Sequence, residues 1–497
     1  MDFKYKKSGT IFNAHSYWTK QPIDIINTFI NTYSKENDVV LDPFCGSGMT
    51  GVSSIMTKRN FILSDISPIC LHISKGYTTK YYTENISDKI ENLLSGLNDY
   101  YKTICPICGK EAIINFSVLK DELENNKELK IEKICYKCSC SKTKLSKSPN
   151  KSDIKQLNVQ DYQNYFFPQD DFFGQEPKRN YKRGIYKVYQ LYSKRNISVL
   201  SILWDRINNL TDENFKNICK FAFTSILYNC SLLSKYNEKY ENTQIKMGTY
   251  FIPHLIKDNN VVESFKRKIN NIIKSNKEIF FDESTNLCGK IFFQDATKLD
   301  KIENNSIDYI YTDPPYSDIL NYAELNIVYE SWLKEKTDCS LEMIVSKSEN
   351  KTIIDYGEMF KEFLKNAYRV LKIDSYISII FHNANLNHWK TFQKVLNSSD
   401  FEPVCTDLPT RLISASKTSS QINTNKKSQC FLAFSMQKKK NRSKNKLKKL
   451  NKNDYINLIN NLKEEAKINN YLTSSDIYDY IINKLMFNYE IDDTITF

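Results

Sequence analysis

The feature that most constrains the fold is a strand that runs into a glycine-containing loop near the N-terminus. Val39–Leu41 is a short apolar run, and glycines with the spacing G-x-G-x-x-G follow it from Gly46. A helical pattern comes next, and a second apolar run at residues 61–64 ends in Asp65. This order predicts half of a Rossmann-like, doubly wound α/β sheet whose loop holds a nucleoside-type cofactor.

A second strand and loop lie far downstream. Ile307–Thr312 is an apolar run that ends in Asp313-Pro314-Pro315-Tyr316. An exocyclic amine of a nucleic-acid base is a poor nucleophile, because its lone pair is delocalised into the ring. The Asp313 carboxylate and the Pro314 carbonyl can accept hydrogen bonds from its N–H groups, and the two prolines fix the loop and remove competing donors. Tyr316 offers a face for an extruded base. The two loops together predict methyl transfer from S-adenosylmethionine to such an amine.

Three acids are expected to define the cofactor site. Asp42 precedes the glycines, where it would repel the pyrophosphate of a dinucleotide but suits a cofactor that carries an ammonium and a sulfonium. A dehydrogenase is therefore the less favoured interpretation. Asp65 is placed to accept hydrogen bonds from ribose hydroxyls. Asp295 follows the apolar run 290–294 and is expected to hold the adenine of the cofactor through its amino group.

Several motifs carry a resemblance to a known family. They are His15 to Pro22, the loop Asp42–Thr50 with Met49 where a threonine is more usual, Asp313–Tyr316, the aromatic stretch 320–325 with Trp332 and Leu333, and Phe381 to Asn383 with Trp389. The chain resembles the amino-methyltransferases of DNA, specifically the adenine-specific methylases with a zinc-ribbon insertion. The likeness covers most of residues 10–436.

The resemblance implies roles for particular residues. His15 and Lys20 would lie near the methionine carboxylate of the cofactor. The cofactor would also contact the loop after the first strand, through Asp42, Pro43, Phe44, Gly46 and Gly48. An Asp-Pro-Pro-Tyr loop is typical of N6-adenine enzymes, whereas N4-cytosine enzymes more often begin this loop with serine.

Paired cysteines in the insertion predict a metal site. Cys105 and Cys108 form one C-x2-C unit, and Cys135 and Cys138 form another. Two such units supply four thiolates for tetrahedral Zn²⁺, which leaves no open coordination position, so the zinc is expected to be structural. Cys140 is an alternative ligand to Cys138, with a less usual spacing.

Composition bounds the partners and the compartment. A net charge of +12 favours a polyanionic partner, which here is double-stranded DNA, and a subunit of a restriction or defence system is a further candidate. No apolar stretch is long enough to span a membrane, and thirteen cysteines without an export signal are expected to be reduced. We therefore expect a cytoplasmic protein without a membrane partner. Residues 177–195 are basic and tyrosine-rich, which suits either phosphate contacts or a solvated helix face.

The organisation of the chain is expected to be modular. The expected units are a first half of the methyltransferase core at 1–95, a zinc ribbon at 96–150, a helical and basic insertion at 151–285 that is a candidate for target recognition, the second half of the core at 286–436, and a basic linker with a helical appendage at 437–497.

Three functions are compatible with these patterns. The favoured one is a site-specific DNA adenine-N6 methyltransferase of a restriction-modification or phage-defence setting. The same chemistry on cytosine N4 or on an RNA base is an alternative, because Asp-Pro-Pro-Tyr loops also occur in RNA guanine methylases. The third is a zinc-ribbon DNA-binding protein whose methylase core no longer turns over.

Overall fold

The computed structural model covers most of the chain. It describes residues 2–5, 9–124, 129–240, 243–282, 287–383, 385–404, 410–414, 431–440, 447–468 and 474–491. Residues 441–446 of the predicted basic linker lie outside the described residues.

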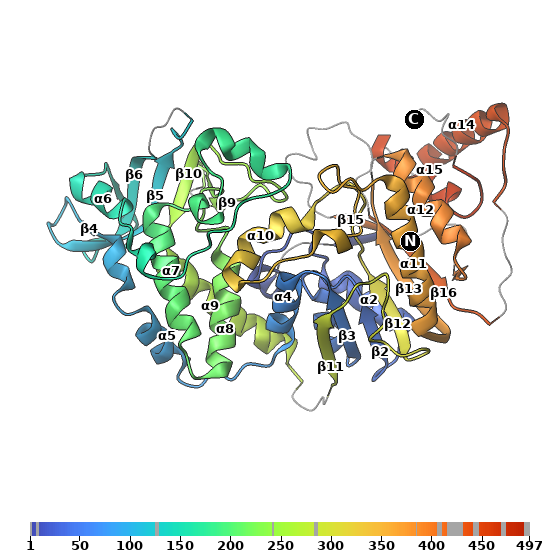
Figure 1. The fold of residues 1–497 in the computed structure, drawn as a ribbon, viewed down its shortest axis with the longest axis horizontal. Coiled ribbons are helices and arrows are strands. Elements are labelled where there is room, and N and C mark those ends of the chain that lie inside the picture. Colours follow the sequence, from blue (N-terminus) through green and yellow to red (C-terminus); the bar gives the residue numbers. More distant parts are fainter. Residues whose placement is uncertain are drawn as a thin grey trace.

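A mixed sheet forms the core, seen on the right in Figure 1. In the described part of the chain it has nine strands, in the order β1-β15-β16-β13-β12-β2-β3-β11, with β14 paired to β16. Their bounds are β1 Asp2–Tyr5, β2 Val39–Asp42, β3 Asn60–Asp65, β11 Gly289–Phe293, β12 Ile307–Thr312, β13 Leu371–Phe381, β14 Glu402–Pro403, β15 Thr410–Ser414 and β16 Phe431–Gln437. The five strands from β13 to β11 are parallel, and β16 is antiparallel to β13.

The order of the parallel strands creates a switch point. From β2 the chain moves outward to β3 and β11, then returns to β12 on the other side of β2 and continues to β13. Right-handed connections then place the helices of the two halves on opposite faces, and the reversal opens a crevice at the carboxyl ends of β2 and β12. The predicted Rossmann-like doubly wound sheet is thus confirmed.

Helices cover this sheet in two groups. The helices of the first half are α1 Thr10–Ala14, α2 Ile23–Tyr33, α3 Met49–Met56 and α4 Pro68–Thr78, and those of the second are α10 Tyr322–Leu333, η5 Cys339–Leu341, α11 Ile353–Val370 and α12 Leu386–Ser398. α2 packs on β12 and on α3, whereas α11 packs on α12. The C-terminal helices are α14 Lys452–Ile468 and α15 Ser474–Leu485, which pack on each other. The end of α15 docks on α12 through Gln393, whose Nε2 donates to the carbonyls of Leu485, Met486 and Tyr489.

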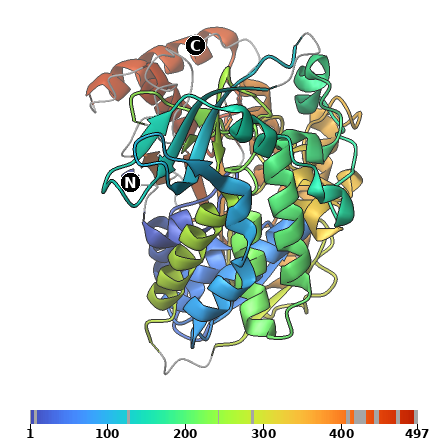
Figure 2. The ribbon, with the colours of Figure 1, turned by 90° about the vertical axis from the view of Figure 1, so that its left-hand side faces the viewer.

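The insertion forms a second, antiparallel sheet with its own helices. In the described residues this sheet has seven strands: β4 Lys102–Ile104, β5 Glu111–Lys120, β6 Lys130–Lys137, β7 Leu145–Lys147, β8 Lys235–Tyr236, β9 Thr243–Gln244 and β10 Leu255–Asn259. The accompanying helices are α5 Ile86–Leu94, η1 Leu97–Tyr101, α6 Lys151–Leu157, η2 Asp161–Asn164, η3 Glu176–Arg183, η4 Val188–Leu191, α7 Lys194–Asn208, α8 Glu213–Ile226 and α9 Val261–Ile279. α7, α8 and α9 lie between the small sheet and the core, and Figure 2 shows the small sheet and these helices from the insertion side.

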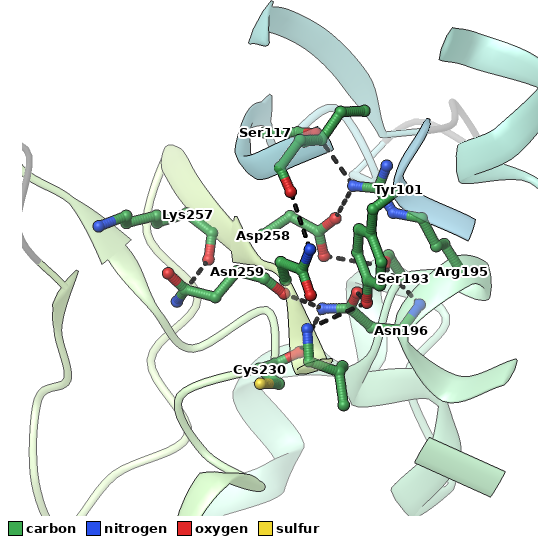
Figure 3. A network of polar contacts seen from close by, with 12 residues as sticks. Tyr101, Ser117, Ser193, Arg195, Asn196, Cys230, Lys257, Asp258 and Asn259 are labelled. Carbon is green, nitrogen blue, oxygen red and sulfur yellow. Dashed lines mark hydrogen bonds and ion pairs between the residues drawn. The ribbon is translucent and has the colours of Figure 1, made fainter. Parts of the chain in front are cut away.

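A buried ion pair joins the insertion's helices to its sheet (Figure 3). Arg195 of α7 and Asp258 of β10 have side chains that are 0% and 2% exposed, and their Nη2 and Oδ2 atoms are 2.6 Å apart. Arg195 Nη2 also donates to Ser117 Oγ of β5, and the Ser193 hydroxyl donates to the second oxygen of Asp258. The guanidinium lies over the ring of Tyr101. This network fixes β5 and β10 against α7.

Candidate functional site

The carboxyl ends of four core strands surround one cavity. It encloses about 660 Å³, including its open mouth, and lies against the loops that follow β2, β3, β11 and β12. Each of these strand ends contributes at least one predicted residue to its lining, among them Gly46, Asp65, Asp295 and Asp313. Since ligands of doubly wound sheets bind at this edge, the topology brings the predicted cofactor and catalytic residues together at the expected place.

Asp42 holds the cofactor loop in place through hydrogen bonds and does not line the cavity. Its carboxylate is buried and accepts hydrogen bonds from the Thr50 hydroxyl at 2.5 Å, the Thr312 hydroxyl at 3.1 Å and the Phe44 amide at 3.2 Å. Burial raises the pKa of Asp42 to about 7. The predicted direct contact with a cationic ligand is therefore not what the structure shows, because the carboxylate is used to join the loop to β12. Pro43 and Phe44, which follow it, do line the cavity.

The two predicted glycines have different positions. The Gly46 N–H donates to Asp65 Oδ2 at 3.0 Å, and Gly46 lines the cavity. Gly48 precedes α3 with a φ of +72°, and a Cβ built on it would lie 2.7 Å from Ser74 of α4. Any side chain at Gly48 would therefore push α4 away, so this glycine shapes the loop without lining the cavity.

Asp65 and Asp295 are held by local hydrogen bonds. Asp65 accepts from the Gly46 and Ser67 amides, and burial raises the pKa of its carboxyl group. Asp295 Oδ1 accepts from the amide and the hydroxyl of Thr297, at 2.9 and 2.7 Å. Both carboxylates are thus fixed in orientation at the cavity wall, as acceptors for ribose hydroxyls and for an amino group would need to be.

The Asp313 carboxylate is held from both sides. Its Oδ2 accepts from the side-chain amide of Gln21 at 2.8 Å, and its Oδ1 accepts from the Tyr316 hydroxyl. Pro315 lines the cavity with Asp313, and its carbonyl accepts from the Tyr356 hydroxyl. Pro314 and Tyr316 are not among the lining residues.

Tyr316 is 4% exposed and packs against Phe381 and Phe431. It holds Asp313 in this structure and presents no free face for a stacked base.

The cavity has a single sign of charge. Its lining contains the carboxylates of Asp65, Asp295, Asp313 and Glu342, and no lysine, arginine or histidine among the described residues. Glu342 follows η5, accepts from the Ala323 amide at 2.9 Å, and has a pKa that burial raises to about 7. We call this cavity the acidic cleft. Its lining fits a cationic ligand such as a sulfonium and would repel a pyrophosphate.

His15 and Lys20 do not line the acidic cleft, contrary to the expectation from the resemblance. The Lys20 ammonium donates to the carbonyls of Phe12 and His15 and to the Tyr77 hydroxyl. His15 stacks on Phe221 of α8, and burial lowers its pKa well below the usual value. These contacts are made with α4 and α8, and no local sequence motif predicts them. Tyr17 and Thr19, between them in sequence, face the cleft instead.

Four cysteines of the insertion form a cluster, but not the predicted four. The Sγ atoms of Cys105, Cys108, Cys138 and Cys140 all lie within 4.8 Å of one another. Two of the separations are 3.7 Å, between Cys105 and Cys140, and 3.5 Å, between Cys108 and Cys138. Tetrahedral zinc with bonds of about 2.3 Å places its sulfur ligands at about this spacing. The cluster therefore suggests zinc.

Cys135, which the sequence predicts as a ligand, does not belong to this cluster. It lies within β6, opposite Phe116 of β5, and packs with Phe116, Val118 and Tyr236 in a small apolar cluster. Successive side chains of a strand point to opposite faces. Tyr136, the next residue, accordingly faces the cluster, with its hydroxyl 3.6 Å from Cys105 Sγ. β6 ends at Lys137, so the second ligand pair comes from the turn after it, as Cys138 and Cys140.

The basic stretch 177–195 is largely engaged with acids of the same chain. Arg183 pairs with Asp121 and Glu124, and Arg195 pairs with Asp258. Arg179 and Lys187 are also in ion pairs, with Glu176 and Asp171. Most of these cations thus have internal partners, which weakens the case for this stretch as a phosphate contact.

Among the helices that the structure describes, none combines the length and apolar character needed to cross a bilayer.

The N-terminal segment of the chain matches a known protein family. Residues 3–76 match the model of a DNA methylase family, N6_N4_Mtase. That segment contains β2, its loop, β3 and Asp65, which form one wall of the acidic cleft. The match supports a DNA methyltransferase of the N6/N4 class, and it leaves open whether adenine or cytosine is the target.

Individual relatives agree with that class. The chain is 21% identical to the type II methyltransferase M.MjaII of Methanocaldococcus jannaschii over 417 residues, which is 78% of this chain and 75% of the relative. It is 41% identical over 70 residues to the type II methyltransferase M2.LlaDCHI of Lactococcus lactis subsp. cremoris, covering 14% of this chain and 25% of the relative. It is also 36% identical over 44 residues to the type II methyltransferase M2.MboI of Moraxella bovis, covering 9% of this chain and 16% of the relative.

A solved structure was matched at low similarity. The rRNA methyltransferase aviRa from Streptomyces viridochromogenes aligns with 76% of this chain and 80% of its own, at 8% identity and a TM-score of 0.25. At this level of similarity the alignment supports no conclusion about fold or function.

Proposed function

We propose that the protein is a DNA methyltransferase that transfers the methyl group of S-adenosylmethionine to the exocyclic N6 amine of adenine. The observation that carries this proposal is the position of Asp313 in the acidic cleft, together with Gly46, Asp65 and Asp295. A cationic cofactor and a catalytic carboxylate would then share one cavity, as transfer between two bound reactants requires.

S-adenosylmethionine would supply a methyl group on a positively charged sulfur. Asp65 is the acceptor for ribose hydroxyls in this proposal, and Asp295 is the acceptor for the adenine amino group. Asp313 would accept a hydrogen bond from the target amine. This bond would stabilise the positive charge that develops on the nitrogen as its lone pair, no longer delocalised into the ring, attacks the methyl group. The side-chain amide of Gln21, which now donates to Asp313 Oδ2, has the same kind of N–H donor as the N6 amine. The amine would therefore take the place of Gln21 at this oxygen.

Tyr316 has a supporting role in this arrangement. Its hydroxyl donates to Asp313 Oδ1, so the carboxylate keeps its orientation when Gln21 is displaced from Oδ2. The amine loses one proton once its nitrogen has become cationic, and this proton can leave to solvent. No side chain with an imidazole is needed for that step. A base within a duplex must be extruded to reach the cleft.

Adenine is favoured over cytosine by the first residue of the loop, which is Asp313 and not serine. Cytosine N4 in DNA and a base in RNA remain the alternatives that use the same geometry. A catalytically silent DNA-binding protein is disfavoured, because Asp65, Asp295 and Asp313 are all oriented toward one cavity. We place the protein in a restriction-modification setting, which the type II methyltransferases among its relatives support.

The cysteine cluster is proposed to hold a structural Zn²⁺ through Cys105, Cys108, Cys138 and Cys140. Four thiolates fill a tetrahedral shell, so the ion would fix the turns next to β4 and β6 and would have no position for a substrate.

The proposal is tested by the identity of the methylated nucleoside. The purified protein is incubated with S-adenosylmethionine labelled in its methyl group and with unmethylated DNA or RNA, and the product is digested to nucleosides. Label in N6-methyladenine of DNA is expected. Label in N4-methylcytosine or only in RNA would contradict the choice of base or of nucleic acid, and absence of label with intact DNA binding would favour the silent binding protein.

A further inference from the structure

A second cavity lies behind the segment that walls the acidic cleft. Its lining includes Lys20 from the N-terminal segment and Arg267, Lys268 and Asn271 from α9. It contains three cationic side chains and, among the described residues, no carboxylate. We call it the basic pocket. Its charge is opposite to that of the acidic cleft.

The cations of the basic pocket are not neutralised within the described chain. Lys20 and Lys268 are 4% and 9% exposed, and their ammonium groups donate only to neutral oxygens. Lys268 Nζ lies 2.7 Å from the carbonyl of Asn13 and 3.3 Å from that of Ala14. Burial, and then the nearby Arg267, lower the pKa of Lys268 to about 8. Arg267 has no ion pair with any described residue. Such a group of cations is costly without an anion.

The basic pocket adjoins the site of catalysis. Tyr17 lines both cavities, Thr19 lines the acidic cleft and Lys20 lines the basic pocket, so one short segment separates the two. Met247 lines the basic pocket on another side. The next residue, Gly248, lies so close to the loop after Asp313 that a Cβ built on it would be 2.8 Å from Leu320 Cδ2. An anion in the pocket would thus lie on the other side of the segment 17–20 from the acidic cleft.

We propose that the basic pocket binds a phosphodiester group of the DNA strand that carries the target base. This inference rests on the proposed function, because the anion is taken to be part of the DNA substrate. A base extruded into the acidic cleft brings the phosphates that flank it against the rim, and Arg267, with five N–H donors, suits a phosphate there. Lys20 and Lys268 lie behind it, and because burial lowers the pKa of both ammonium groups, a bound phosphate would favour their charged forms. The basic pocket thereby holds the strand in register while the acidic cleft holds the base and the cofactor.

The test uses Arg267→Gln, with Lys277→Gln as the matched control. Both residues lie on α9 and both changes remove one positive charge, but Lys277 is exposed and outside the basic pocket. The dissociation constants for duplex DNA and for S-adenosylmethionine are measured for both variants at a series of salt concentrations. Asn271→Asp, which adds a negative charge to the pocket, serves as a second variant if Arg267→Gln does not fold.

The expected result is specific to DNA. Losing one phosphate contact lowers the slope of log K against log salt by about 0.9 and weakens DNA binding by about tenfold at 0.1 M salt. The affinity for S-adenosylmethionine stays as in the unmodified protein, and Asn271→Asp weakens DNA binding in the same direction.

An Arg267→Gln slope equal to that of Lys277→Gln would overturn the proposal. A loss of S-adenosylmethionine affinity with an unchanged DNA slope would overturn it too, and would assign the pocket to the carboxylate of the cofactor. Because these are binding measurements, they remain informative if no methylated base is found, so the failure of this inference and the failure of the proposed function are distinguishable.

Discussion

Replacing Asp258 by asparagine should destabilise the insertion strongly. Asp258 is the carboxylate partner of Arg195, whose side chain is 0% exposed. Within the described chain, Arg195 Nε and Nη1 have no hydrogen-bond partner, so Nη2, with its bonds to Asp258 and Ser117, makes the polar contacts of this guanidinium. Asp258→Asn keeps the size of the side chain but leaves the buried cation uncompensated, and we expect a loss of about 3–5 kcal/mol in the free energy of unfolding.

The effect should be local, and the assay should be local too. A chain with two sheets need not unfold in one step, so a single melting temperature is a poor measure. Hydrogen exchange reports opening free energies segment by segment, and the loss is expected in α7, β5 and β10 (Figure 3) but not in β2, β3 or β12.

The double variant Arg195→Met, Asp258→Asn is the control. It removes the uncompensated charge, so we expect it to be more stable than Asp258→Asn alone. A cost below about 1 kcal/mol for Asp258→Asn, or a double variant that is less stable than the single one, would refute the reasoning.

Three further predictions follow from the sites. Cys140→Ser should abolish zinc binding, whereas Cys135→Ser should keep one equivalent of zinc. The buried hydroxyl of Cys135→Ser should lower the free energy of unfolding by only about 1–3 kcal/mol. Metal analysis separates the two variants, and zinc loss in Cys135→Ser alone would restore the ligand set predicted from the sequence. The affinity for S-adenosylmethionine should rise with pH through about pH 7, because Glu342 ionises there and the ligand is cationic. In calorimetry, the affinity for S-adenosylhomocysteine, which lacks the sulfonium charge, and the affinity of Glu342→Gln for S-adenosylmethionine should each depend less on pH. An equal pH dependence in the three measurements would exclude Glu342 as the group that senses the ligand charge. The pKa of Asp42 in the folded protein is raised to about 7, so its contribution to the free energy of unfolding is lost as pH rises from about 4 to about 7. Asp42→Asn should therefore flatten the dependence of stability on pH in that range. An unchanged dependence would mean that Asp42 is not the group that titrates.

The sequence predicted the core because its signals are local. The strands β2, β3 and β12 are apolar runs bounded by loops with glycine or proline, and the residues at their ends, Asp65 and Asp313, line the acidic cleft. These features depend on neighbours in sequence and on general rules of α/β sheets.

The residues that were missed depend on contacts across the fold. Gln21 lies in the motif from His15 to Pro22, but its contact with Asp313 depends on packing between distant segments. Glu342 reaches the cleft in the same way and stands in no motif. His15 carried a motif, but its ring is held by α8, far along the chain. Cys135 was assigned to the metal site because Cys135 and Cys138 have the C-x2-C spacing. The cluster instead contains Cys138 and Cys140, which are separated by one residue and follow the end of β6.

Asp313 is the group that is proposed to hold the target amine, and its replacement is the most direct test. Methyl transfer at saturating S-adenosylmethionine and DNA should be measured for Asp313→Asn and for Asp318→Asn, a control in the same loop with a side chain that is 47% exposed. Asp313→Asn should lower the rate by about 10²–10³-fold while the affinity for S-adenosylmethionine changes little, and Asp318→Asn should keep most of the rate. A variant Asp313→Asn that methylates DNA at the original rate would contradict the account.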